Sequence, residues 1–405
     1  MNKNSITVIG LGYIGFPTLL LLSNKSKYIY GYDIDKKKIN DIKKNKIKLS
    51  EKKTQKLYNK LLKENKIYVS DTLHKSATYI ITVQTPVDNQ NNADLKYLVS
   101  AIKNIIPHLD KNTLIIIEST SPVGTIQKMI TLIKKKKPKF FLNNKPIFNI
   151  CYCPERLLPG KTLFELTNNP RVIGAMTEEC FKKASNIYRK FSNAKFYYTT
   201  IETAELSKLA ENTYRDINIA YANFLKLYSD KFKIDISKLI ELANRHPRVN
   251  ILKPSIGVGG HCIPVDPLFL INKKQNKYFD SLIKSSRLIN DRMPDYYFQK
   301  IKKMISNPKN IRITILGLSY KENIDDFRNS PSIKILRKLS KLNFKKINYC
   351  EPHLNYKIFN HKNLFKIDLK DIYRSSDIII KLVNHDEFKN INFKYPKITF
   401  LDYSN

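Results

Sequence analysis

The stretch that decides the fold is Ile6-Thr-Val-Ile-Gly-Leu-Gly-Tyr-Ile-Gly15. Residues 6–9 are apolar and β-branched, which is typical of a fully buried parallel strand. The glycines that follow have the spacing Gly-x-Gly-x-x-Gly, in which Gly10 permits a tight turn, Gly12 lets a pyrophosphate approach the backbone and Gly15 allows close packing of a helix. The stretch therefore predicts a strand, a turn and a helix whose N-terminal N–H groups bind phosphate.

A carboxylate follows the next predicted strand. Residues 29–32 are predicted to form a second buried strand, and Asp33 ends it, 18 residues after Gly15. A carboxylate at that position binds the ribose hydroxyls and repels a 2′-phosphate, so NAD is favoured over NADP. The alternative is a solvated acid at a strand end. The glycines alone are weak evidence, but with the strand, the helix and Asp33 they predict NAD as the cofactor.

The rest of the chain extends this pattern to an α/β fold. Further buried strands are predicted at residues 79–83 and 113–117, with helical patterns between them, so the first part forms a doubly wound parallel sheet. Residues 203–232 form one long helical stretch without Gly or Pro. Its length suits a helix that connects two domains and pairs with a partner chain.

A second α/β unit begins near residue 311 and lacks the glycine triplet, so it is a Rossmann-like unit for another ligand. Its strands are predicted at residues 311–316, 345–349, 377–383 and 398–401. The predicted fold is α/β, with two Rossmann-like doubly wound domains joined by a central helical domain that contains the long helix. We expect domain bounds of 1–200, 201–300 and 301–405.

The formal net charge is +37, from 72 basic and 35 acidic residues. This excess favours anionic ligands such as nucleotide diphosphates. It does not predict specific nucleic-acid binding, because lysine is spread along the whole chain without a basic tail. The longest run, residues 134–137, is expected in a loop.

The five cysteines are an odd number without paired spacing, which favours a reducing cytoplasm over a disulfide framework. Cys151-x-Cys153 has no second pair and no nearby histidine cluster, so no metal site is predicted. Residues 6–22 resemble the core of a signal peptide, but their glycines and Pro17 favour a strand, turn and helix. No other run is long enough to span a membrane.

The best nucleophile candidate is Cys262, in Gly257-Val-Gly-Gly-His-Cys-Ile-Pro-Val-Asp266. A thiolate adds to an aldehyde to give a thiohemiacetal, and its oxidation gives a thioester that water cleaves. A nicotinamide site and a thiol in one chain suggest an alcohol oxidised through the aldehyde to an acid. The alternative is a buried structural cysteine, which we expect for most of the other four.

Seven ordered motifs resemble the nucleotide-sugar 6-dehydrogenases of the UDP-glucose/UDP-N-acetylhexosamine dehydrogenase family, from residue 6 to about residue 390. The motifs lie at residues 10–17, 84–86, 118–125, 153–156, 207–212, 257–266 and 324–331. Residues 153–160, 169–174, 242–252 and 259–267 are similar to the UDP-N-acetyl-D-mannosamine dehydrogenase branch. UDP-glucose enzymes usually have a lysine where this chain has Val265.

The resemblance implies catalytic roles. Lys208 and Asn212 lie four residues apart, on one face of the long helix, where a cation and an amide stabilise an oxyanion at C6. The alternative for Lys208 is a solvated helix lysine. Glu155 resembles the general base of thioester hydrolysis, and its alternative is a surface salt bridge with Arg156. Asp266 resembles the acid that helps to order the lysine and a water near the sulfur. The alternative for Asp266 is a turn or cap residue before Pro267.

Thr120 resembles the threonine that borders the nicotinamide and the active water; the alternative is a helix cap before Pro122. The other implied cofactor contacts are Tyr13, Ile14, Thr85 and Arg328. The implied substrate contacts are Glu155, Arg156, Lys208, Asn212, Arg245, His246, Arg248, Asn250, Gly259, His261 and Lys321. Arg245 and Arg248 suit contacts to a diphosphate or sugar. Residues that resemble contacts to uridine diphosphate or between domains are Asn250, Lys321 and Arg328. His261 suits a role in the substrate pocket or in packing better than a role as a base.

Some positions depart from the family pattern. Glu51 is followed by Lys52 and Lys53 where the family has Glu-Pro-Gly-Leu, Phe224 replaces an acid on the long helix, and Ser255-Ile replaces Gly-Pro before the cysteine turn. The C-terminus also differs. All proposed catalytic residues remain, so these departures concern affinity and efficiency more than reaction type.

The sequence thus predicts a cytoplasmic, dimeric enzyme that oxidises UDP-N-acetyl-D-mannosamine to its uronic acid with NAD, for bacterial surface polysaccharide. UDP-N-acetylglucosamine and UDP-glucose remain alternative substrates. An alternative of another class is a decayed enzyme that only binds nucleotides or polyanions, for which salt-sensitive binding without NADH production would be the sign.

Overall fold

The computed structural model describes residues 2, 4–49, 51–88, 90–157, 160–271, 277–354, 359, 363–392 and 394–404. The chain divides into two compact units, Met1–Ala210 and Glu211–Asn405. Each has its own sheet and its own buried core.

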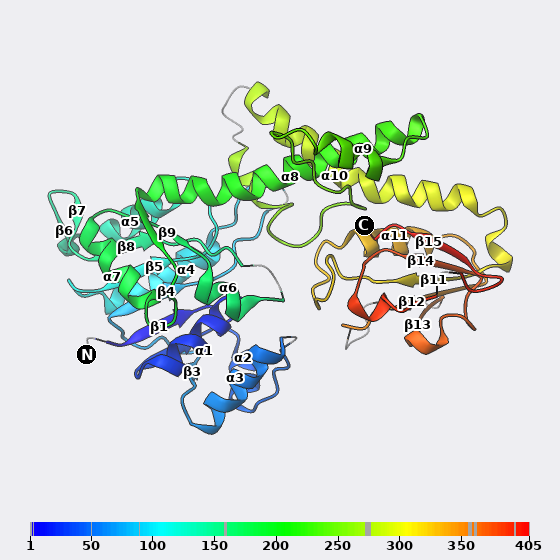
Figure 1. Ribbon diagram of the computed structural model, residues 1–405. Helices are drawn as coiled ribbons and strands as arrows, with labels where there is room; N and C mark the ends of the chain where they lie inside the picture. The colour runs from blue at the N-terminus through cyan, green and yellow to red at the C-terminus, as the bar shows by residue number, and fades with distance from the viewer. Residues whose placement is uncertain are drawn as a thin grey trace. The chain divides into compact units, whose positions relative to one another are not determined.

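The first unit is built on a sheet with the strand order β10-β9-β8-β5-β4-β1-β2-β3 (Figure 1). Its strands are β1 (Ile6–Ile9), β2 (Ile29–Tyr32), β3 (Tyr68–Ser70), β4 (Thr78–Ile81), β5 (Leu114–Ile117), β8 (Asn149–Tyr152), β9 (Arg171–Ala175) and β10 (Phe196–Thr199). The order reverses between β1 and β4, where open α/β sheets bind ligands at the carboxyl ends of their strands. The sheet is not wholly parallel, because β8 and β9 pair antiparallel.

Helices cover both faces of this sheet, which confirms the doubly wound prediction (Figure 1). One face shares a core with α1 (Gly15–Lys25), α2 (Lys36–Lys43), α3 (Lys52–Lys63), α6 (Thr162–Asn168) and α7 (Glu178–Tyr188). The other packs on α4 (Lys96–Ile105), α5 (Thr125–Lys136) and the start of α8 (Ile201–Lys231). Neighbouring strand residues alternate between the cores, as Val8 and Ile9 do.

The lysine run at residues 134–137 was expected in a loop, and this expectation is wrong. Lys134, Lys135 and Lys136 form the last turn of α5. Cations are favourable there because they face the negative end of the helix dipole.

The second unit contains the rest of α8, α9 (Ile236–Ala243), α10 (Lys277–Met304), α11 (Pro331–Leu339) and a parallel sheet of order β13-β12-β11-β14-β15 (Figure 1). Its strands are β11 (Arg312–Leu316), β12 (Lys346–Cys350), β13 (Leu364–Lys366), β14 (Ile378–Lys381) and β15 (Thr399–Asp402). Side chains of α10 and α11 cover one sheet face, and the other face packs around Ile372 and Phe388. The predicted class, two Rossmann-like domains joined by a helical part with a long helix, is confirmed.

The short elements are η1 (Ile106–His108), η2 (Pro138–Phe140), η3 (Asp266–Leu270), η4 (Pro308–Asn310), η5 (Leu369–Asp371), η6 (Asp386–Phe388) and the hairpin of β6 (Phe141–Leu142) and β7 (Lys145–Pro146).

The sequence did not predict α10, a helix of 28 residues with Pro294 inside it. Proline removes one helical hydrogen bond and frees the carbonyl four residues earlier, which here is that of Asn290. A Cβ added at Gly257 would lie 3.2 Å from this carbonyl and 3.1 Å from Pro294 Cδ. The segment before the cysteine turn therefore packs against α10 at the point where the proline interrupts the helix.

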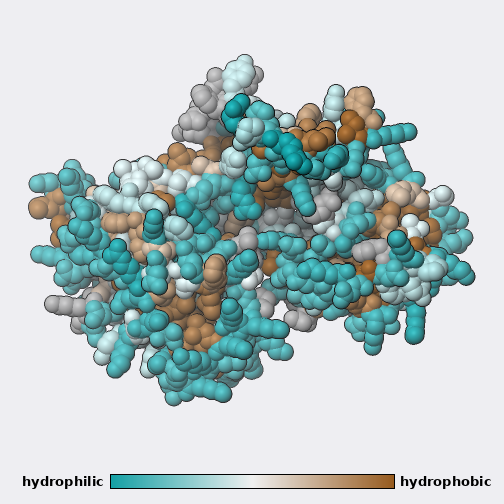
Figure 2. Space-filling view, viewed as in Figure 1, coloured by the Kyte–Doolittle hydropathy of each residue, from teal (hydrophilic) through white to brown (hydrophobic). Residues whose placement is uncertain are grey.

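Hydrophilic residues dominate the face shown in Figure 2, and hydrophobic ones appear between them in smaller groups. This agrees with lysines spread along the sequence. Among the described residues, no helix combines the length and the apolar character needed to cross a membrane.

Candidate active site

The three glycines after β1 differ in what a side chain would meet. Gly10 has φ +90°, which suits glycine. A Cβ at Gly15 would lie 1.9 Å from the Gly10 carbonyl oxygen and 2.3 Å from Thr82 Oγ1. A Cβ at Gly12 would meet nothing within 4 Å. Gly15 is thus required by packing within the protein, whereas Gly12 leaves open space at the backbone, as a bound pyrophosphate needs.

Asp33 connects the end of β2 to the glycine turn. Its Oδ2 accepts a hydrogen bond from the Leu11 N–H at 2.9 Å and forms an ion pair with Lys38 Nζ at 2.7 Å. Its Oδ1 accepts a hydrogen bond from the Asp35 N–H at 3.0 Å. Only 7% of Asp33 is exposed, so the alternative of a solvated acid is wrong. Its carboxylate is held at the site where the dinucleotide fold binds a ribose.

The other predicted cofactor residues lie around this turn. Ile14 precedes α1 as its N-cap, and Tyr13 is partly exposed, with its hydroxyl accepting a hydrogen bond from Thr162 Oγ1 at 3.0 Å. Within the described residues the buried Thr85 hydroxyl has no hydrogen-bond partner. A buried hydroxyl without a protein partner suits a ligand contact. The open space at Gly12 and this hydroxyl fit NAD.

Thr120 is half-buried in the segment that follows β5. The alternative that it caps a helix is wrong, because α5 begins at Thr125 with Gly124 as its N-cap. The cap is supplied by the buried Glu205 of α8, whose carboxylate accepts hydrogen bonds from the N–H groups of Gly124 at 2.6 Å and Ile126 at 2.9 Å. A carboxylate there also complements the helix dipole.

Glu155 lies in the segment after β8, and only 5% of it is exposed. Its Oε2 pairs with Arg171 Nη1 at 2.6 Å, and its Oε1 accepts the backbone N–H of the half-buried Arg156 at 2.7 Å. The alternative of a surface salt bridge is therefore wrong, because the carboxylate is buried with an arginine from β9. Sequence reasoning missed Arg171, although Asn169-Pro-Arg171 belonged to a quoted motif.

Lys208 and Asn212 lie one turn apart on α8, each 7% exposed. The alternative that Lys208 is a solvated lysine is therefore wrong. Asn212 Nδ2 donates to Asp266 Oδ2 at 2.5 Å, which joins the helix to the residue that begins η3. Asp266 is 3% exposed. A buried amide on a buried carboxylate fixes the orientation of both groups.

Cys262 has a half-buried thiol that is in no disulfide, in the turn before η3. Its carbonyl accepts hydrogen bonds from the N–H groups of Val265 at 3.0 Å and Asp266 at 2.8 Å. A Cβ at Gly259 would lie 2.5 Å from that of Tyr320, and Gly260 has φ +84°. Glycine is required here by packing within the protein; a substrate contact at Gly259 stays a prediction.

A series of hydrogen bonds holds the segment that precedes this turn. Asn223 Oδ1 accepts from the Ser255 N–H at 2.7 Å, and Asn223 Nδ2 donates to Asn290 Oδ1 at 2.9 Å. Asn290 in turn donates to the Asp216 carboxylate at 2.8 Å, which pairs with Arg287 at 2.5 Å. Sequence reasoning missed this series, because its members are far apart along the chain.

Several predicted substrate residues are on the surface. The segment that follows α9 contains four of them, all exposed: Arg245, His246, Arg248 and Asn250. Arg245 forms an ion pair with Glu241 at 3.2 Å. His261 is also exposed, Lys321 is half-buried, and Arg328 forms an ion pair with Asp326 at 2.5 Å. None of these residues belongs to the core, and their contact with a substrate stays a prediction.

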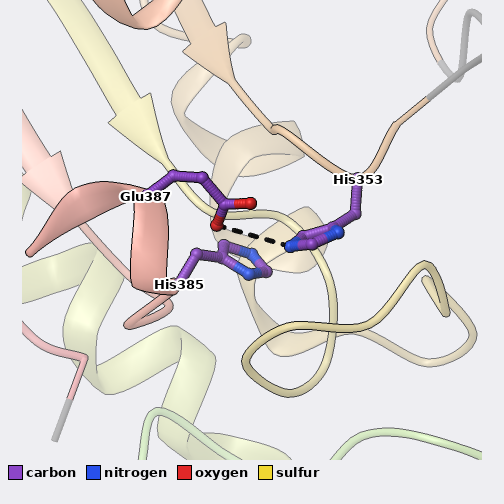
Figure 3. A group of neighbouring side chains, drawn as sticks. All are labelled: His353, His385 and Glu387. Carbon is purple, nitrogen blue, oxygen red and sulfur yellow. Dashed lines mark ion pairs between the residues drawn. The ribbon is translucent and has the colours of Figure 1, made fainter. Parts of the chain in front are cut away.

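Figure 3 shows His353, His385 and Glu387, which come together in the second unit, with an ion pair between His353 and Glu387 at 3.5 Å. His385 Nδ1 accepts the Asn323 N–H at 2.9 Å, and its Nε2 lies 3.2 Å from Glu351 Oε2. Both ring nitrogens are therefore used within the protein. These contacts account for His385, whereas within the described residues His353 Nε2 forms no hydrogen bond and lies in the ion pair with Glu387.

The glycine turn and the acid at the end of β2 define a dinucleotide-dependent oxidoreductase. Comparison with protein families narrows this class. Residues 4–192 match the NAD binding domain of the UDP-glucose/GDP-mannose dehydrogenase family, residues 202–292 its central domain and residues 314–400 its UDP binding domain. The chain belongs to the UDP-glucose/GDP-mannose dehydrogenase family, and the predicted NAD cofactor and dehydrogenase activity are confirmed.

Individual relatives agree with this assignment. The chain is 38% identical to the UDP-N-acetyl-D-mannosamine dehydrogenase of Campylobacter jejuni, over 96% of this chain and 97% of that protein. It is 39% identical to the enzyme of that name from Methanococcus vannielii, over 97% and 88%. Among solved structures, the UDP-D-ManNAc dehydrogenase from Pyrococcus horikoshii is similar, with a TM-score of 0.86, 35% identity and coverage of 99% and 95%. The predicted resemblance to this branch is confirmed.

Proposed function

We propose that this chain oxidises UDP-N-acetyl-D-mannosamine at C6 to UDP-N-acetyl-D-mannosaminuronate with two equivalents of NAD⁺. The observation that carries the proposal is the half-buried thiol of Cys262, which is in no disulfide and precedes Asp266, the residue that holds the amide of Asn212. The names of the similar enzymes support the substrate.

The first part of the mechanism takes an alcohol to a thioester. NAD⁺ supplies the acceptor for the hydride that leaves C6 in each of the two oxidations. Lys208 and Asn212 stabilise the negative charge that develops on the C6 oxygen. The thiolate of Cys262 adds to the aldehyde carbon, and the new C–S bond remains when the second hydride leaves, so that a thioester results.

The second part is hydrolysis. Glu155 accepts a proton from water, and the hydroxide adds to the thioester carbon. Lys208 and Asn212 hold the oxyanion of the tetrahedral intermediate, the C–S bond breaks, and the Cys262 sulfur leaves as a thiolate. Asp266 keeps the Asn212 amide oriented for both parts. Thr120 borders the nicotinamide and the attacking water.

Binding roles follow the same proposal. Gly10, Gly12, Tyr13, Ile14, Gly15, Asp33, Thr85, Thr120 and Arg328 contact NAD. Arg245 and Arg248 pair with the diphosphate or sugar as planar donors. The remaining substrate contacts are Arg156, His246, Asn250, Gly259, His261 and Lys321.

We place this reaction in a homodimer in the cytoplasm, where its product supplies surface polysaccharide. The aromatic side chains of Phe224 and Tyr228 on α8 and of Phe232, which directly follows α8, are 46%, 51% and 60% exposed and support pairing with a second copy. Five free thiols suit a reducing compartment. The family matches support three domains near residues 1–200, 201–300 and 301–405.

The test is NADH formation, followed by absorbance, when purified protein receives NAD⁺ and UDP-N-acetyl-D-mannosamine. We expect about two NADH per sugar, and none from Cys262→Ala. Activity only with UDP-glucose or UDP-N-acetylglucosamine would keep the mechanism and change the substrate. No NADH with any of the three would favour a protein that binds nucleotides without turnover.

A further inference from the structure

A buried group of four ionisable side chains lies around the proposed base. Glu118 follows β5, Glu155 follows β8, Arg171 begins β9 and Tyr188 ends α7, all within the first unit. Their exposed fractions are 2%, 5%, 3% and 0%. The proposed mechanism uses only Glu155, so the other three have no assigned role.

The four side chains form one continuous line of contacts. Arg171 Nη1 pairs with Glu155 Oε2 at 2.6 Å, and the guanidinium lies over the ring of Tyr188, 4.5 Å from its centroid. The Tyr188 hydroxyl donates to Glu118 Oε1 at 2.6 Å. Arg171 is also fixed by donating from Nη2 to the Leu166 carbonyl at 3.2 Å.

The charges of this group do not balance if every member is ionised. Two carboxylates would share one guanidinium, which leaves a net charge of −1 away from water. Burial of an uncompensated charge is costly, and one of two neighbouring carboxyls normally keeps its proton. The direct ion pair of Arg171 is with Glu155. The proton therefore belongs on Glu118.

The surroundings of Glu118 also favour its neutral form. Within the described residues its Oε2 is buried without a hydrogen-bond partner, and leaving such an oxygen without a donor costs less in a neutral acid than in a carboxylate. Burial raises the pKa of Glu118 to about 7; Arg171 opposes this effect, the charge of Glu155 adds to it, and the Tyr188 hydrogen bond opposes it. A carboxyl of this kind changes its charge near neutral pH.

The remaining groups that face Glu118 stay neutral over this range. Burial raises the pKa of Cys153 to about 12, and a hydrogen bond with Cys180 together with burial holds the pKa of Cys151 well above its ordinary value. Burial also holds the pKa of Tyr188 well above its ordinary value. The titration of the group near pH 7 is therefore that of Glu118.

We propose that Arg171 is a positioning residue that keeps Glu155 ionised and oriented, and that Glu118 keeps the buried group neutral by retaining a proton. The inference rests on the proposed function, because it concerns the residue that acts there as the base. Arg171 restrains one oxygen of Glu155 by a charge-assisted hydrogen bond. Below about pH 7, where Glu118 is neutral, this cation is not shared between two carboxylates.

The first experiment reads the proton on Glu118 without enzyme activity. In infrared difference spectra of the intact protein, the band of a buried carboxylic acid should disappear with a midpoint near pH 7. Glu118→Gln should remove this step. Tyr188→Phe keeps the ring beside Arg171 but loses the hydroxyl that lowers the pKa of Glu118, so the midpoint should move to higher pH. The matched control is Glu205→Gln, another buried carboxyl of the first unit, which should leave the step in place.

The second experiment follows kcat against pH with the sugar that the wild type oxidises. Arg171→Gln removes the cation beside Glu155, so the charged base becomes less favourable and the acid limb of the profile should move up by about one pH unit or more. Arg171→Lys keeps the charge without the planar fork. It should return the limb toward that of the wild type at a lower kcat.

The outcomes separate this inference from the proposed function. No NADH from the wild type with any sugar would overturn the proposed function, while the infrared step would still test the proton on Glu118. An active wild type whose infrared step persists in Glu118→Gln would overturn the inference alone. So would an Arg171→Gln profile that falls equally at every pH. If Glu118→Gln does not fold, a Tyr188→Phe midpoint equal to that of the wild type is the contradicting result.

Discussion

The contrast between Gly12 and Gly15 gives a sharp test of how the glycine turn works. Substitution of either by alanine adds the same single methyl group, three residues apart. At Gly15 that methyl would lie 1.9 Å from the Gly10 carbonyl oxygen and 2.3 Å from Thr82 Oγ1, whereas at Gly12 nothing lies within 4 Å. One variant should therefore harm the fold and the other should harm only the binding of NAD.

The magnitudes follow from these distances. The atom that the Gly15→Ala methyl meets first belongs to the backbone and cannot rotate away, so α1 must move from β1. Overpacking of this kind should lower the free energy of unfolding by about 3 kcal/mol. For a unit of this size, that loss lowers Tm by roughly 6–12 °C. Gly12→Ala should change the free energy of unfolding by less than about 0.5 kcal/mol. Because its methyl occupies the space that a pyrophosphate needs, the Kd for NAD should rise at least about tenfold, or 1.4 kcal/mol.

The assays are thermal unfolding without ligand, followed by circular dichroism, and calorimetric titration with NAD. The wild type and both variants are compared at one protein concentration. Equal losses of Tm in the two variants would refute the packing argument. Wild-type affinity in Gly12→Ala would refute the approach of the pyrophosphate to this backbone.

Three further predictions concern the second unit and α8. Burial alone would raise the pKa of Glu351, but hydrogen bonds from a histidine ring and from backbone N–H groups hold this pKa below its ordinary value. The ionised Glu351 therefore stabilises the fold at pH values above the ordinary pKa, and this stabilisation is lost as the pH falls through the pKa of the folded state. Glu351→Gln should lower the free energy of unfolding by about 2–3 kcal/mol at pH 7, with a difference that disappears in urea titrations at acid pH; a constant difference would contradict this. Asp266→Ala removes the acceptor of the Asn212 amide, so kcat should fall about 100-fold through misplacement, and unchanged steady-state kinetics would contradict this role. Phe224→Ser with Tyr228→Ser should convert the proposed dimer to a monomer in light scattering, and a dimer that persists in this variant would contradict pairing through these side chains.

Local patterns determined the cofactor half of this protein. The glycine spacing, the strand before it and Asp33 act over a short span, so the turn, α1 and β2 follow from the sequence and the structure has them. The same holds for α8, whose 31 residues lack helix-breaking residues. The helix α10 was missed because Pro294 lies inside it, and the effect of a proline depends on what packs beside the freed carbonyl.

The candidate catalytic residues were found by motif, but their surroundings were not. The sequence placed Glu155, Lys208 and Asn212 on the right elements and left solvated alternatives open for the two charged residues. Glu155 and Lys208 are only 5% and 7% exposed, which excludes those alternatives. Sequence reasoning could not show this, because burial depends on segments far away in the chain. The partners Arg171 and Asp266 lie 16 and 54 residues from the groups they contact.

The sequence by itself therefore determined the α/β class, the NAD turn, the long helix and the motif of the candidate cysteine, because each depends on residues that are neighbours along the chain. Only the tertiary structure decided which charges are buried together, that β8 and β9 pair antiparallel, and that Glu118 and Glu155 lie in one buried group with Arg171 in the first unit. The physical reason is that the cost of a buried charge depends on which groups from distant segments surround it, and spacing along one chain does not contain that information.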